Sequence, residues 1–159
     1  MKPVYRGILI GAVQCLMVLS VAGKYAFDRA TLPRAWVNAT PVDPSLWVRG
    51  RYVSLNLQVE MPEGYSGYYQ PVRIHAAGGR LIATPDPNGR GLTASRVQQR
   101  PWILTQPVAF YLPEHAADPS RLRQGEELWV EVSVPNYGPP RPLRLAIKKD
   151  GNFVPLALP

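Results

Sequence analysis

The chain has 159 residues, enough for one domain with its own hydrophobic core and too few for two. Its 18 prolines are more than twice the usual share of about 5%, and proline breaks the interior of helices. Because 46% of the residues are hydrophobic, the composition excludes a largely disordered chain and favours short strands joined by turns.

The formal net charge of +7 is concentrated near the N-terminus. Residues 1–34 carry five basic side chains and one acidic side chain, whereas the remainder has 13 basic and 10 acidic residues. Basic residues beside an apolar segment belong to membrane topology more often than to nucleic-acid recognition. The rest of the chain has no stripe of Lys and Arg interleaved with aromatic residues, so we expect no nucleic-acid partner.

The N-terminal segment has the pattern of a membrane helix. Two basic residues precede 17 uncharged residues, 7–23, and Lys24 follows. As a helix this run rises about 26 Å, close to the thickness of the hydrocarbon core of a bilayer. We therefore predict a cytoplasmic segment over 1–6 and a transmembrane signal-anchor helix over 7–24, with the lipid bilayer as its partner.

Two questions about this segment stay open at the level of sequence. A cleaved signal peptide is the alternative to an anchor, because Ser20-Val21-Ala22 fits the small-x-small rule for cleavage. Basic residues on both sides of the segment leave the orientation open. Cys15 lies within the segment without a partner, so the sequence predicts no disulfide and no cysteine metal cluster.

We predict an extended linker over 25–40 and a β-rich domain over 41–159. Asp43 and Pro44 start a turn, and Gly50 permits a positive φ just before a strand. Alternating apolar residues then predict a strand with one buried face: Val53, Leu55, Leu57 and Val59.

Further strands follow in the same half of the domain. The first of them returns as the partner of the strand at 53–59, and Gly78-Gly79 makes a tight turn into the second. A loop-like stretch over 85–100 separates these from two more. The predicted ranges are 72–76, 81–83, 102–105 and 108–112.

The same device begins again 75 residues later, where Asp118 matches Asp43 and Gly125 matches Gly50. The alternating apolar positions also match without a gap, at Leu128, Val130, Val132 and Val134. A lone three-stranded unit cannot bury its apolar face, whereas two units can pack together. We therefore predict an all-β fold, a small sandwich or partly open barrel built from two similar β-units over 43–83 and 118–157.

The stretch TPVDPSLWVRGRYVSLNLQVE resembles the bacterial GDYXXLXY family, which is named after the motif Gly-Asp-Tyr-x-x-Leu-x-Tyr. Three of the five fixed positions match, at Gly50, Tyr52 and Leu55. Arg51 replaces the acidic residue, which puts in doubt any role built on that side chain, and Leu57 replaces the second tyrosine.

The resemblance extends to the segment VAFYLPE, which contains Pro113 and Glu114, and spans most of residues 35–159. It implies a membrane-tethered domain at the bacterial inner membrane that faces the periplasm, and the family has no established biochemical activity. The motif and turn residues that we single out as structural are Asp43, Pro44, Gly50, Tyr52, Leu55, Pro113, Glu114 and Gly125.

The sequence predicts no catalytic, cofactor-binding or metal site. His75 and His115 lie 40 residues apart with no cysteine nearby, and no serine lies in a G-x-S-x-G context. Glu127 and Glu131 fall on the outward face of a strand, where we interpret them as solubilising edge charges. We therefore predict that the protein is not an enzyme, with an unrecognised hydrolase as the last alternative.

The loop GYSGYY contains the candidate contact surface, Tyr65, Tyr68 and Tyr69, because tyrosine offers a large rigid surface with a polar end. The alternative is that these rings cover the edge of their own sheet. Trp36 is expected near the lipid interface.

The predicted function is a non-catalytic interaction or structural role beside another envelope protein, and the alternative is a secreted or periplasmic binding module left after cleavage. The sequence identifies no small-molecule ligand.

Overall fold

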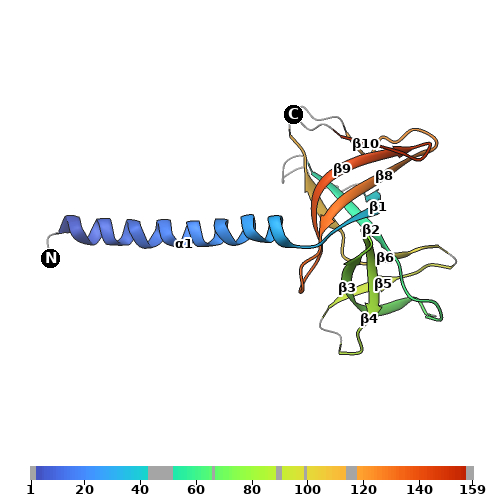
Figure 1. Ribbon diagram of the computed structural model, residues 1–159, viewed down its shortest axis with the longest axis horizontal. Helices are drawn as coiled ribbons and strands as arrows, with labels where there is room; N and C mark the ends of the chain where they lie inside the picture. The colour runs from blue at the N-terminus through green and yellow to red at the C-terminus, as the bar shows by residue number, and fades with distance from the viewer. Residues whose placement is uncertain are drawn as a thin grey trace. The chain divides into compact units, whose positions relative to one another are not determined.

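The computed structural model describes residues 3–42, 52–65, 67–88, 91–98, 100–113 and 118–156. The chain forms two compact units, Met1–Leu32 and Pro33–Pro159. The first unit is helical and the second is a β-domain (Figure 1).

The first unit consists of helix α1, Pro3–Thr31. Its stretch Gly7–Thr31 is long and apolar enough to cross a membrane, and none of its apolar window is buried. The helix ends where Pro33 lacks a backbone donor and disfavours helical dihedral angles at Leu32. The prediction of a linker over 25–40 is therefore wrong, because the helix continues to Thr31 and a strand begins at Arg34.

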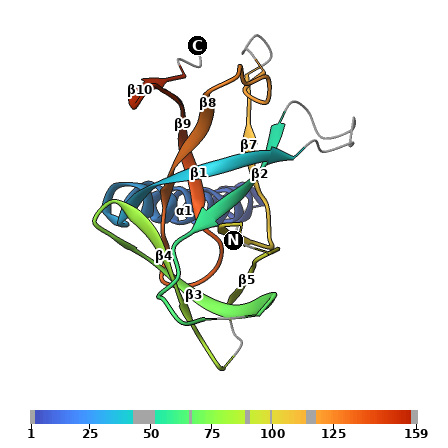
Figure 2. The same cartoon turned by 90° about the vertical axis from the view of Figure 1, so that its right-hand side faces the viewer.

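In the second unit, the described residues form ten strands of one antiparallel sheet. The order across the sheet is β10-β9-β8-β1-β2-β6-β5-β3-β4, and β7 pairs with β2. Figure 2 shows β1 and β2 in the middle of this arrangement. The strands are β1 (Arg34–Val42), β2 (Tyr52–Val59), β3 (Tyr69–Ala77), β4 (Arg80–Pro85), β5 (Leu92–Ser95), β6 (Trp102–Leu104), β7 (Val108–Tyr111), β8 (Glu126–Ser133), β9 (Arg141–Lys149) and β10 (Asn152–Pro155).

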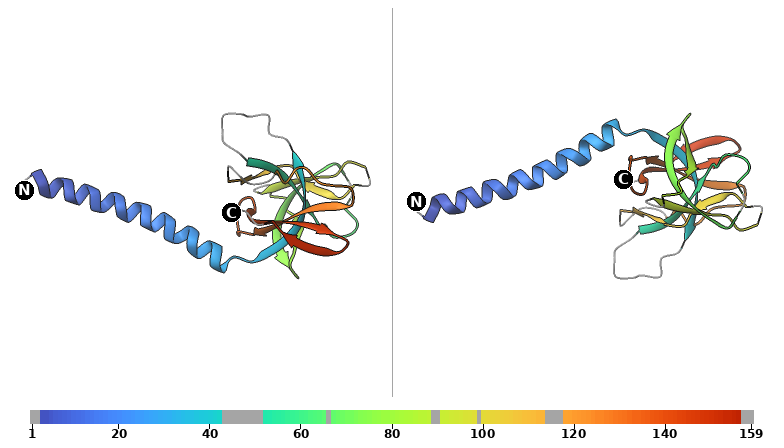
Figure 3. Two further views of the ribbon diagram at one scale, coloured as in Figure 1. Left: turned by 90° about the horizontal axis from the view of Figure 1, so that it is seen from above. Right: turned by 90° about the horizontal axis from the view of Figure 1, so that it is seen from below.

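The sheet curls back on itself without closing completely. β4 returns to the end of β2, where the backbone N of Glu60 donates to the O of Leu81 at 3.0 Å and the N of Ala83 donates to the O of Glu60 at 2.8 Å. The N of Trp36 also donates to the O of Gly79, at 2.9 Å, in the turn before β4. Figure 3 shows the curled sheet from two further sides. The predicted all-β, partly open fold is confirmed.

In the two segments whose alternation was matched, the apolar residues form part of the hydrophobic core, on the face that the alternation predicts. Leu55, Leu57 and Leu128 are almost completely buried, and burying a leucine side chain contributes about 1.5–3 kcal/mol to folding. Every alternating apolar position that was matched between the two predicted units belongs to this core: Val53, Leu55, Leu57, Val59, Leu128, Val130, Val132 and Val134. The strand prediction for both segments is confirmed.

The strand β1 is the main element that the sequence patterns missed. It pairs with β8 over Arg34–Asn38 and with β2 over Ala39–Val42, so it joins the two halves of the sheet. Its inward residues are Ala35, Val37 and Ala39, all buried. Two alanines in three inward positions give only weak hydrophobic alternation, and this explains why the segment resembled a linker.

The two predicted repeats share a hairpin but differ in how their first strands pair. β3–β4 and β9–β10 are both antiparallel hairpins whose two turn residues have positive φ, Gly78-Gly79 and Asp150-Gly151. β8 pairs with β9, whereas β2 pairs with β1, β6 and β7. The prediction that residues 72–76 return beside the strand at 53–59 is therefore wrong, because β3 pairs with β4 and β5.

Candidate functional site

Half of the motif and turn residues singled out in the sequence lie in the described part of the chain: Tyr52, Leu55, Pro113 and Gly125. Leu55 is fully buried, and the rings of Tyr52 and Tyr111 lie 6.0 Å apart across the β2–β7 pair. Gly125 has a φ of 84°, which glycine adopts without strain, just before β8, and Pro113 is exposed. The other four lie outside the described residues: Asp43, Pro44, Gly50 and Glu114.

The three tyrosines of the candidate contact surface are exposed. The exposed fractions are 43% for Tyr65, 71% for Tyr68 and 69% for Tyr69. One backbone hydrogen bond ties Tyr68 to the segment after β5, since the N of Arg96 donates to the O of Tyr68 at 3.0 Å. Within that segment, Arg96 Nε donates to the O of Gln98 at 3.1 Å. Tyr65, Tyr68, Arg96 and Gln98 line a shallow cavity of about 340 Å³. The rings of this loop are therefore solvent-exposed.

The carboxylates of β8 do not lie at a sheet edge, because β8 is enclosed by β1 and β9. Glu131 is 9% exposed and lies between two arginines, with Arg34 Nη1 at 3.5 Å from Oε1 and Arg144 Nε at 3.6 Å from Oε2. The prediction that Glu131 is a solubilising edge charge is therefore wrong. It links the first strand of the domain to β8 and β9 by ion pairs.

Three aromatic rings gather on the outer face of this part of the sheet, and we call them the aromatic cluster: Trp36, Trp129 and Phe153. Phe153 lies 5.8 Å from Trp36 and 5.3 Å from Trp129 between ring centroids, the latter edge to face. Lys148 Nζ lies 4.9 Å from the Trp129 centroid and 5.6 Å from that of Phe153. Ala146 pairs with Trp129 on this face and is fully buried, and its small side chain leaves room for the rings.

A row of hydrogen-bonded polar side chains runs beside the aromatic cluster across three strands. Gln58 Nε2 donates to Asn38 Oδ1 at 3.1 Å, and Asn38 Nδ2 donates to Glu127 Oε2 at 3.3 Å. The same carboxylate oxygen accepts from Trp129 Nε1 at 3.0 Å. The row links β2, β1 and β8, which hold these residues at neighbouring register positions.

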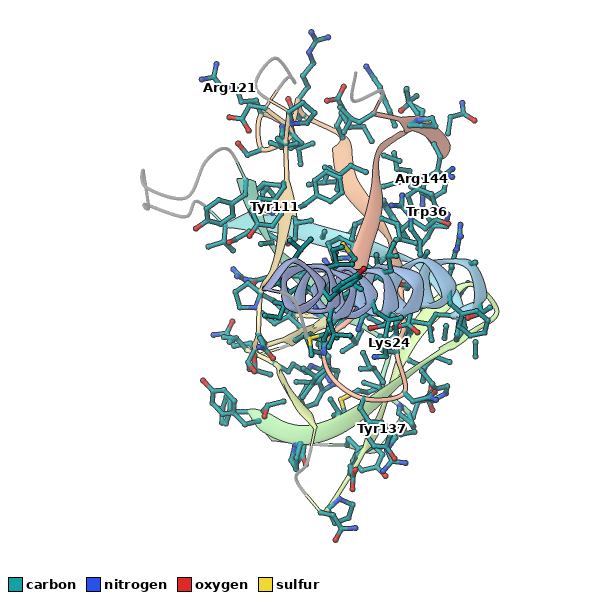
Figure 4. All side chains as sticks on the ribbon, turned by 90° about the vertical axis from the view of Figure 1, so that its left-hand side faces the viewer. Lys24, Trp36, Tyr111, Arg121, Tyr137 and Arg144 are labelled. Atoms are coloured by element: carbon teal, nitrogen blue, oxygen red, sulfur yellow. The ribbon has the colours of Figure 1, made fainter. Side chains whose placement is uncertain are left out.

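The aromatic cluster and the amides of this row line one groove of about 870 Å³, which we call the aromatic groove. Its other wall is the turn at Gly78-Gly79 with Arg80, whose Nη1 lies 3.3 Å from Glu60 Oε1. Figure 4 shows the side chains of the β-domain and labels Trp36, Arg144, Tyr111 and Tyr137 among them. The described residues that line the groove are Trp36, Val37, Asn38, Gln58, Val59, Glu60, Gly78, Gly79, Arg80, Leu81, Pro101, Trp129 and Phe153.

A second cavity of about 530 Å³ lies between β3 and the loop that joins β8 to β9. Among its lining residues, Arg73 Nη2 lies 3.3 Å from Asp86 Oδ2, and Tyr137 has 84% of its surface exposed. His75, which the sequence suggested to be an ordinary strand histidine, is exposed on β3. Among the described residues, no group of three or more His, Cys, Asp or Glu side chains could hold a metal ion.

The tight packing of Gly91 at this cavity gives a stability prediction. Gly91→Ala is expected to lower the free energy of unfolding by about 1–3 kcal/mol, because its Cβ would lie 2.5 Å from the backbone O of Val72. Thermal unfolding of the full chain in detergent, followed by tryptophan fluorescence, measures the effect. Asn88→Ala, an exposed position in the same region, is the matched control and should change stability by less than about 0.5 kcal/mol. Equal melting temperatures for the two variants would contradict the close approach.

The aromatic groove was missed by the sequence patterns, although one signal was present. Trp129 stands between Glu127 and Glu131 on the outward side of an alternating strand, where an aromatic residue is unexpected. Trp36 occupies the corresponding outward side of β1, between buried Ala35 and Val37. Such positions identify candidate surface aromatics, but the pattern within one strand does not reveal which of them meet.

Comparison with known proteins leaves this geometry without an assigned role. No family model, no curated protein and no solved structure matches the chain. The resemblance of the sequence to the GDYXXLXY family therefore stays a prediction from its motif residues.

Proposed function

We propose that this protein is a single-pass membrane-anchored β-domain protein that acts as a non-catalytic interaction module of the bacterial envelope. The observation that carries the proposal is the stretch Gly7–Thr31 of α1, which is apolar enough to cross a membrane and exposes its large hydrophobic side chains. Exposed apolar side chains on all sides of a helix are costly in water and are stable in lipid.

The location at the inner membrane with the domain in the periplasm is the finer part of the proposal. It is supported by the motif residues that resemble the envelope family, Tyr52 and Leu55 among those the structure describes. The interaction role is supported by two features of the β-domain, the exposed tyrosine loop and the aromatic groove. Clustered exposed aromatic residues are typical of surfaces that bind partners.

Cell fractionation tests the anchor. We expect the full-length chain to stay in the membrane fraction after an alkaline carbonate wash, with the mass of the uncleaved polypeptide. Protease added to spheroplasts should digest the β-domain if it faces the periplasm. A soluble periplasmic product with the mass of a polypeptide cleaved after Ala22 would contradict the anchor and support the cleaved binding module.

Crosslinking in intact cells tests the tyrosine loop. The double substitution of Tyr68→Ala and Tyr69→Ala is expected to reduce recovery of the crosslinked partner about tenfold, because it removes two exposed aromatic contact surfaces. Tyr137→Ala removes a tyrosine of another loop that is even more exposed, at 84%, and should leave recovery unchanged. Unchanged recovery for the double variant would exclude Tyr68 and Tyr69 from the contact.

A further inference from the structure

We infer that the aromatic groove of the β-domain binds a neutral oligosaccharide. This inference names a ligand for the proposed interaction module and rests on that module having a binding role, but it does not depend on the membrane anchor. The groove has a volume of about 870 Å³, within the range of about 300–1,000 Å³ that is usual for small-molecule sites.

The aromatic side of the groove matches the apolar faces of sugar rings. A sugar ring presents axial C–H groups on one face, and these carry partial positive charge that is attracted to the negative face of an aromatic ring. Trp36, Trp129 and Phe153 all line the groove. The indole of Trp129 is held in place by a hydrogen bond, in which Nε1 donates to Glu127 Oε2 at 3.0 Å, so the ring is positioned before any ligand arrives.

The polar floor of the groove matches the hydroxyl and acetamido groups of a sugar. A primary amide side chain has two N–H donors and a carbonyl with two lone pairs. The bonds of the polar row use one donor of Gln58 and one donor of Asn38, which leaves each amide a second donor for a ligand. Amides that both donate and accept suit hydroxyl groups, which do the same.

The charge in the groove favours a neutral ligand. Among the described lining residues, the charged side chains are Glu60 and Arg80, which form an ion pair with each other. Glu127 at the end of the polar row already accepts two hydrogen bonds. Lys148, which is not a lining residue, contacts the rings of Trp129 and Phe153 through its ammonium group, at 4.9 and 5.6 Å from their centroids. Among the lining residues a phosphate or nucleic acid would find no uncompensated cation, whereas an uncharged polar ligand needs none.

The backbone of the floor also argues against an added peptide strand. Asn38 pairs with Trp129 across β1 and β8, and Gln58 pairs with Ile103 across β2 and β6. On the sides of β1 and β2 that face the groove, the N of Trp36 donates to the O of Gly79 at 2.9 Å and the N of Glu60 donates to the O of Leu81 at 3.0 Å. A peptide that extends a sheet needs a free strand edge, and here the β3–β4 hairpin already takes that place. The groove therefore offers side chains to its ligand, as a sugar site does.

Tryptophan fluorescence of the full chain tests the inference, because two groove residues are tryptophans. The protein is kept in a polyoxyethylene detergent, because the sugar headgroup of an alkyl glycoside detergent would itself compete for the groove. It is titrated with cellotetraose, maltotetraose and chitotetraose, which differ in linkage and in acetamido groups. At least one of them is expected to change the fluorescence saturably. Trp36→Ala and Phe153→Ala should each weaken that binding by about tenfold or more.

Two further variants keep the test specific. Asn38→Asp removes the amide donors and adds a charge to the polar row, and it should abolish binding while the melting temperature shows whether the fold is retained. Tyr137→Ala, outside the groove, should bind as the wild type does.

Saturable binding that the groove variants do not weaken would overturn the inference, as would no response to any of the three sugars. A domain that binds sugar but leaves the membrane fraction would contradict the anchor alone. If no sugar binds and Trp36→Ala loses a crosslinked protein partner, the proposed interaction role stands, but the ligand of the groove is a protein and the inference of a sugar is wrong.

Discussion

Replacing Leu16 and Leu19 by arginine is expected to remove the protein from the membrane fraction. Both residues lie within Gly7–Thr31 and both are exposed, with 72% and 70% of their surface accessible. An arginine near the centre of a membrane helix costs about 2.5–3.5 kcal/mol on insertion scales, so two cost roughly 5–7 kcal/mol. This lowers the partition into the bilayer by a factor on the order of 10⁴.

The control is the pair Leu16→Ala and Leu19→Ala, which shortens the same side chains without charge and should leave the protein membrane-bound. Carbonate-washed membranes and the soluble fraction are compared by immunoblot, and the mass of the product is determined. Retention of the double arginine variant in washed membranes would mean that α1 is not what holds the protein there.

Leu57→Ala is expected to lower the free energy of unfolding by about 2–5 kcal/mol, since large-to-small changes at fully buried positions lose packing and leave a cavity. Leu57 is 0% exposed and pairs with Ala39, where the two halves of the sheet meet. For a domain of this size, the melting temperature should fall by about 10 °C.

Asn56→Ala provides the matched control, because the adjacent residue points to the other face of β2 and is only partly buried. It should lower the melting temperature by less than about 2 °C. Thermal unfolding of the full chain in detergent measures both variants. A smaller loss for Leu57→Ala than for Asn56→Ala would contradict the assignment of Leu57 to the core and with it the register of β2.

Local patterns predicted the strands whose inward residues are large and aliphatic. Val53 to Val59 and Leu128 to Val134 alternate with period two, and this period follows from the geometry of a single strand. The tight turns at Gly78-Gly79 and Asp150-Gly151 are local as well, because their positive φ values depend on the turn residues themselves. By contrast, β1 was missed because Ala35 and Ala39 give little hydrophobic contrast.

Pairing could not be predicted in the same way. β2 and β3 are neighbours in sequence, yet β6 and β5 lie between them in the sheet. Glu131 has the pattern of a solvated charge, and it is buried only because β1 and β9 enclose β8 and bring Arg34 and Arg144 to it. Which strand lies beside which is decided by contacts between distant parts of the chain, and a single segment contains no record of them.

The sequence by itself determined that the chain has an apolar N-terminal helix and a β-rich domain with alternating buried faces, because hydrophobic periodicity and proline content act through local geometry. Only the tertiary structure decided the strand order and the aromatic groove. The groove needs Gln58, Asn38 and Trp129 in one row and Phe153 beside them. These residues lie on four strands, β2, β1, β8 and β10, and the register of the sheet is what brings them together.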